Sequence, residues 1–100
     1  MAKIVSRQYI YNKTLTTANT EYSQQLPAWA KEFVIQCRTA YDVRIAFTSG
    51  KVAVPTEPYW TIVAEDNASQ HNMCEPKDVP TTIYIASSTA GVVVEIWVIA

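Results

Sequence analysis

The stretch that decides the fold class of this chain is Thr81-Thr-Ile-Tyr-Ile-Ala-Ser-Ser-Thr-Ala-Gly-Val-Val-Val-Glu-Ile-Trp-Val-Ile-Ala100. It holds two strongly β-forming runs on either side of a turn rich in Ser, Thr, Ala and Gly. In the second run, one face carries Val92, Val94, Ile96 and Val98, and the other carries Val93, Trp97 and Ile99. Both faces therefore have to be covered, either inside a β-sandwich or by a neighbouring subunit.

Working back from this stretch, the clearest further strands are residues 31–38 and 41–47. Apolar and polar side chains alternate along both, which indicates antiparallel strands with one face toward water and a hairpin or a corner between sheets at residues 39–40. We expect further strands at 3–11, which reads as an edge strand or an arm, and at 20–26, 52–54 and 59–64. The fold class is therefore all-β, an antiparallel β-sandwich or jelly roll of about six to eight short strands.

The length of 100 residues predicts a single domain spanning residues 1–100. Residues 1–12 are expected to form an extended N-terminal arm, and residues 65–80, the longest polar stretch, a surface loop without strand or helix period. The N-terminus lacks the apolar core of a secretory signal, so we expect the chain to be made in the cytoplasm. A net charge of -1 provides no basic surface for nucleic acid or for an anionic membrane, so neither is an expected partner.

Candidate chemistry in the chain is sparse. His71 and Cys74 have a spacing that could place two ligands on a metal, but a zinc site uses three or four protein ligands and this chain has one histidine. Completing such a set would require Asp66, Glu75 or Asp78, and we expect no metal site. Nothing in the sequence pairs a nucleophile with a base, so no catalytic residue, no cofactor and no enzymatic activity are predicted.

The aromatic residues have two interpretations. Trp29, Tyr59 and Trp60 could form a stacking platform, which would make the protein a carbohydrate-binding β-sandwich. Alternation favours a core or interface role, because Trp60 shares a face with Ile62. In the same way, Trp97 shares a face with Val93 and Ile99.

The layout of the chain from about residue 14 to residue 100 resembles that of the small β-sandwich virion proteins of tailed bacteriophages. The chain begins with a short arm and Thr-rich strand pairs, followed by Leu26-Pro27. Two strand-forming runs come next, Phe33-Val-Ile-Gln-Cys-Arg38 and Tyr41-Asp-Val-Arg-Ile-Ala-Phe47, and then a polar loop. The chain ends with Thr82-Ile-Tyr-Ile-Ala86 and a turn into a Val-rich last strand. These virion proteins include capsid decoration or cement proteins and head or tail accessory proteins. The chain departs from them in having only two glycines.

This resemblance implies a non-enzymatic virion protein, a capsid decoration or cement protein that stabilises the head, with a neck, tail or fibre accessory role as the alternative. It implies a homo-oligomer, a dimer or trimer, whose partners are the major capsid protein or other virion proteins. We expect the arm and the 65–80 loop to make the contacts. The interface candidates are Ile4, Val5, Tyr9, Ile10, Tyr11, Trp29, Tyr59, Trp60, His71, Met73 and Trp97.

Overall fold

The computed structural model describes residues 8–38, 41–63, 70–73 and 80–100. Within these ranges the chain forms eight β-strands and no helix. The strands are β1 (Gln8–Leu15), β2 (Tyr22–Gln25), β3 (Glu32–Cys37), β4 (Val43–Ala46), β5 (Trp60–Ile62), β6 (Gln70–Met73), β7 (Thr82–Ala86) and β8 (Val92–Ile99). The all-β fold class predicted from the sequence is confirmed.

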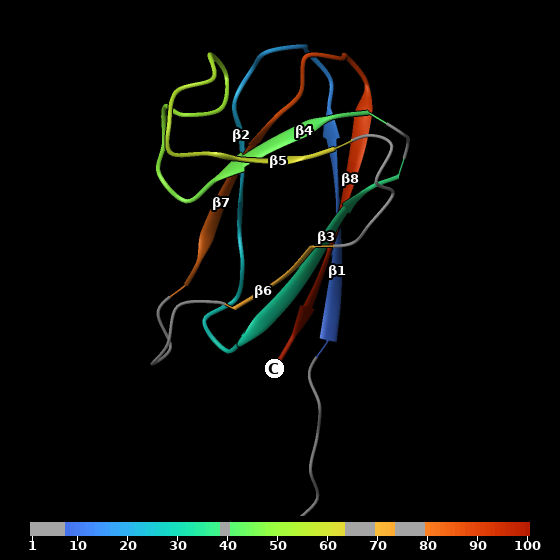
Figure 1. Ribbon diagram of the computed structural model, residues 1–100. Helices are drawn as coiled ribbons and strands as arrows, with labels where there is room; N and C mark the ends of the chain where they lie inside the picture. The colour runs from blue at the N-terminus through green and yellow to red at the C-terminus, as the bar shows by residue number, and fades with distance from the viewer. Residues whose placement is uncertain (1–7, 39–40, 64–69, 74–79) are drawn as a thin grey trace, which may run out of the picture.

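In the described part of the chain, the strands form two antiparallel sheets of four strands each, seen in Figure 1. The first sheet has the order β1-β8-β3-β6 and the second the order β2-β7-β4-β5. The pairings are nested, because β1 pairs with β8, β2 with β7, β3 with β6 and β4 with β5. Two further pairings, β3 with β8 and β4 with β7, complete the sheets. This arrangement is that of an eight-stranded jelly roll, one of the two forms expected.

The core lies between the two sheets and follows the alternation of β8. Val92, Val94, Ile96 and Val98 are buried against the second sheet, so within this chain the cover expected for both faces of β8 is complete on one face. The other face of β8 is only partly covered and carries Val93, Glu95, Trp97 and Ile99. The inward-facing partners come from both sheets and include Leu15, Phe33, Ile35, Val43, Ile45, Ile83 and Ile85.

The connection from β3 to β4 and the connection from β7 to β8 both cross from one sheet to the other, so neither is a hairpin. β3 lies in the first sheet and β4 in the second, so the chain changes sheet between residues 37 and 43. The turn that ends at Gly91 likewise joins β7 in the second sheet to β8 in the first. Gly91 has a φ of 78°, a conformation that glycine adopts without steric cost, and its N–H donates to the carbonyl of Leu15 at 2.8 Å.

The predicted strand at 52–54 is wrong, because residues 52–55 form turns. Val52 is nevertheless fully buried, since it packs with Ala46, Ala86 and Tyr84 of the second sheet. Arg44 holds this loop against the sheet through a 2.7 Å hydrogen bond from its Nε to the carbonyl of Val52. Alternation alone gave no sign of this contact, because it depends on a long connection folding back over β4.

Two other expected segments differ from the structure. Gln70–Met73, inside the stretch predicted to be a loop, forms β6 and pairs with β3. The sequence pattern does not predict this strand, because three of its four residues are polar and it is short. Of the expected arm, residues 8–12 belong to β1, the edge strand of the first sheet, and residues 1–7 lie outside the described residues. The remainder of the predicted loop, 65–69 and 74–80, is described only at Pro80.

Candidate functional site

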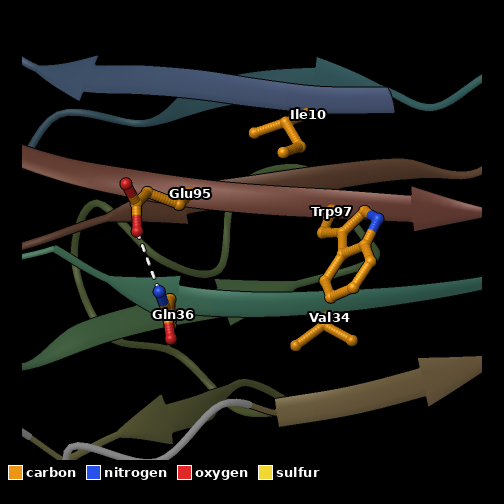
Figure 2. Close-up of a pocket in the computed structure, with 5 residues that line it drawn as sticks. All are labelled: Ile10, Val34, Gln36, Glu95 and Trp97. Atoms are coloured by element: carbon orange, nitrogen blue, oxygen red, sulfur yellow. Dashed lines mark hydrogen bonds between the residues drawn. The ribbon is translucent and has the colours of Figure 1, made fainter. Parts of the chain in front are cut away.

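The outer face of the first sheet carries an apolar row that crosses three strands. Ile10 of β1 lies opposite Trp97 of β8, and Trp97 lies opposite Val34 of β3. With Gln36 and Glu95 these side chains line an open hollow of about 300 Å³, shown in Figure 2 and called here the Trp97 hollow. Every second residue of these strands points away from the second sheet, and this outer face lies outside the core between the sheets. The side chains on it are therefore free to line an open hollow.

The indole of Trp97 is fixed although it is exposed. Its relative exposure is 45%, and its Nε1 donates a 3.0 Å hydrogen bond to Oε1 of Gln8 on the neighbouring strand. Figure 2 shows the ring between Ile10 and Val34, extending from β8 toward β3. The hydrogen bond and the flanking apolar side chains together limit the rotamers that the indole can adopt.

The other half of the hollow is a polar network. Glu95 accepts a 2.8 Å hydrogen bond from Nε2 of Gln36 at one carboxylate oxygen and a 2.9 Å charged bond from Nε of Arg38 at the other. Arg38 also donates to Oδ1 of Asn12 at 3.2 Å, so the network joins β1, β8 and the end of β3. The hydrogen bond from Gln36, followed by those from Arg38, lowers the pKa of Glu95, and the carboxylate is charged at neutral pH.

A second hollow, of about 270 Å³, lies where β4 ends and β5 begins. We call its three aromatic residues, Phe47, Tyr59 and Trp60, the aromatic end; Ile45, Ala46, Thr48 and Pro58 complete the lining. Phe47 is 55% exposed and Trp60 is 60% exposed. The connection that carries them runs from green to yellow in Figure 1.

The aromatic end is continuous with the core. Phe47 meets the fully buried Phe33 edge to face, with ring centroids 6.3 Å apart. Trp60 lies opposite Ile45 in the β4–β5 ladder. It shares a face with Ile62 as predicted, but Ile62 is buried whereas Trp60 is not, because Trp60 lies at the outer end of an edge strand. A core position is therefore wrong for Trp60, and also for Trp97, which is 45% exposed; an interface role for either residue stays a prediction.

The sequence-predicted interface residues separate into these two places and a third group. Ile10 and Trp97 meet in the Trp97 hollow, and Tyr59 and Trp60 meet at the aromatic end. Tyr11 and Trp29 are half-buried against the core. Tyr9 contacts Tyr11 with ring centroids 4.8 Å apart.

Two further candidates, His71 and Met73, belong to β6. His71 is opposite Val34 in the β3–β6 register, and Met73 is opposite Glu32. Ile4 and Val5 fall outside the described residues, as does Cys74, whose spacing from His71 could place two ligands on a metal but is insufficient for a metal site. Within the described ranges, no group of three His, Cys, Asp or Glu side chains is placed to hold a metal ion, and no helix is long and apolar enough to cross a membrane.

Sequence reasoning missed Val34, Gln36 and Glu95 of the Trp97 hollow and Phe47 of the aromatic end. The alternation of β3 and β8 does put the first three on the outward face, but only the register shows that they meet Trp97. Phe47 directly follows β4, contacts the buried Phe33 and is nevertheless more than half exposed. The Arg44 guanidinium, on the outward face of β4, donates to the carbonyl of Val52 and to Oδ1 of Asn19.

Comparison of the chain with protein-family models, with curated proteins and with solved structures found no significant match.

Proposed function

We propose that this protein is a non-enzymatic structural protein of a bacteriophage virion, of the capsid decoration or cement type. In this proposal it is made in the host cytoplasm and binds the major capsid protein or another virion protein. The layout resemblance of the sequence supports it, and the eight-stranded jelly roll is a fold found among viral capsid domains and lectins. Because one fold serves many functions, the fold alone does not support this function, and the main structural support is an exposed aromatic surface.

That surface is the aromatic end. Phe47, Tyr59 and Trp60 gather exposed aromatic area around a small hollow, and contact with Phe33 backs it with the rigid core. Exposed apolar clusters of this kind mark protein-binding surfaces, and Trp and Tyr are the residues that most often dominate binding energy.

The strand beside the aromatic end supports the same use. In the described part of the second sheet, β5 is an edge strand whose hydrogen-bonded neighbour is β4. A partner strand added to such an edge gains backbone hydrogen bonds, while neighbouring side chains supply selectivity. A dimer or trimer of this chain on a repeating lattice would multiply weak single contacts into stable attachment.

The test begins with particles of the phage whose genome encodes the chain. An antibody against the purified protein should detect it in purified particles and label the heads in electron micrographs. Label confined to necks, tails or fibres would move the protein to the accessory class, and its absence from particles would refute the proposal.

Variants then test the surface. Heads produced without the protein are mixed with wild-type protein, Trp60→Ala or Tyr59→Ala, and bound protein is measured by sedimentation. We expect each variant to lose about tenfold or more in affinity, the usual effect of truncating an aromatic hot spot. Tyr41→Ala is the matched control, because Tyr41 is an exposed aromatic residue before the other end of β4. Equal binding by all four proteins would exclude the aromatic end as the docking surface.

A further inference from the structure

The Trp97 hollow has a different composition from the aromatic end. One half is apolar and flat, made by Ile10, Trp97 and Val34, and the other half is the hydrogen-bonded group around Glu95. Protein-docking patches bury charged groups only at a cost, whereas a ligand with one apolar face and a polar rim matches both halves. We propose that the Trp97 hollow is a carbohydrate-binding subsite that takes one neutral pyranose ring. This proposal is independent of particle docking through the aromatic end.

The apolar half suits the face of a pyranose. The C–H bonds on one side of a pyranose ring form an apolar surface with partial positive charge, and the face of an aromatic ring carries partial negative charge. Trp97 is exposed enough to be reached, and its hydrogen bond to Gln8 holds the indole before any ligand arrives. Fixing the side chain in advance lowers the entropy lost on binding.

The polar half suits the hydroxyl groups of the same ring. Each carboxylate oxygen accepts more than one hydrogen bond, so Glu95 can accept from neighbouring hydroxyls while it keeps its bonds from Gln36 and Arg38. Those two bonds also orient the carboxylate and lower its pKa, which keeps it an acceptor at neutral pH. Hydrogen bonds to a charged acceptor are stronger than those between neutral groups.

Size and charge select this occupant over others. The volume of about 300 Å³ lies at the lower limit for small-molecule sites. A stable protein interface buries about 1,000 Å² or more, whereas the apolar row is three residues wide among the described side chains and is followed along the strands by a charged network. The ion pair between Arg38 and Glu95 balances one charge of each sign, so the hollow favours a neutral ligand over an ion.

The test uses methyl glycosides of glucose, galactose, mannose and N-acetylglucosamine as probes of the full chain. Each is added to ¹⁵N-labelled protein, and the indole N–H resonances of the tryptophans are followed. We expect at least one glycoside to shift the Trp97 resonance in a saturable manner with a Kd of about 1–10 mM, while Trp29 and Trp60 stay in place. A Trp97 resonance that none of the four shifts would overturn the proposal.

Two variants separate binding from folding. Glu95→Gln keeps the shape of the side chain and the indole, and we expect it to weaken glycoside binding about tenfold. Glu57→Gln, a change at an exposed glutamate outside the hollow, is its control and should bind as wild type does. Trp97→Ala should abolish binding without loss of the β circular-dichroism signal. Undiminished affinity in Glu95→Gln, or a Trp97 shift that follows protein concentration instead of glycoside, would overturn the assignment.

Discussion

Gln8 and Trp97 lie 89 positions apart in the chain, and Oε1 of Gln8 accepts a 3.0 Å hydrogen bond from Nε1 of Trp97. The contact joins the start of β1 to the end of β8, two strands that pair along their whole length. An exposed indole is thereby held in one orientation on an otherwise open sheet face.

Replacing Gln8 by Ala should release the indole without unfolding the protein. The bond is exposed to solvent, so we expect a stability loss of about 1 kcal/mol or less. The order parameter of the Trp97 indole N–H, measured by ¹⁵N relaxation, should fall toward the range of flexible groups. Thr14→Ala is the control, because Thr14 lies on the same face of β1 as Gln8 but opposite Val93, and it should leave the order parameter of the Trp97 indole unchanged. An unchanged order parameter in Gln8→Ala would show that packing alone holds the ring.

Glu95 should make the stability of the fold depend on acid pH. Hydrogen bonds from Gln36 and then Arg38 lower its pKa in the folded state, so the folded protein binds fewer protons than the unfolded chain. The resulting stabilisation is fully present above the unfolded pKa of about 4.3 and is lost as the pH falls through the lower folded pKa. Urea unfolding from neutral to acid pH should therefore show the difference between wild type and Glu95→Gln shrinking toward acid. A difference that stays constant with pH would contradict this role.

Phe33 and Phe47 should be energetically coupled. Phe33 is fully buried, and Phe33→Ala should destabilise the fold by about 3–5 kcal/mol. Phe47→Ala should cost less because more than half of that side chain is exposed. If their edge-to-face contact stabilises the fold, a double-mutant cycle by chemical denaturation should give a coupling of about 0.5–1.5 kcal/mol. Strict additivity would mean that the exposed aromatic end is not braced by the core.

Arg44 should protect the loop that covers the second sheet. Its guanidinium donates to the carbonyls of Val52 and Ala53 at 2.7 and 3.4 Å. Arg44→Met removes these bonds and leaves the carbonyls without this donor, so we expect a loss of about 1–3 kcal/mol. Limited trypsin digestion followed by mass spectrometry should then show faster cleavage after Lys51. Arg38→Met, which alters the opposite sheet, should leave that cleavage rate unchanged.

Prediction from the sequence worked best for features that depend on the alternation of residues within a single strand. The alternation of β8 placed Val92, Val94, Ile96 and Val98 on one face, and these four residues are buried. It failed for Val52, whose burial depends on Arg44 and on the return of a long loop. It failed also for β6, because a segment of three polar residues and one methionine becomes a strand only when β3 offers an edge to pair with.

The sequence by itself determined the all-β class and the alternation that puts Glu95 and Trp97 on the opposite face of β8 from Val92, Val94, Ile96 and Val98, because these follow from the local two-residue period of extended chain. Only the tertiary structure decided which strands are neighbours. The nested pairing brings Ile10, Val34 and Trp97 into one row, and the pairing of β4 with β5 brings Phe47 and Trp60 to one hollow. Such pairings join residues far apart in sequence, so the free energy that selects them comes from the packing of both sheets together and is not written in any one segment.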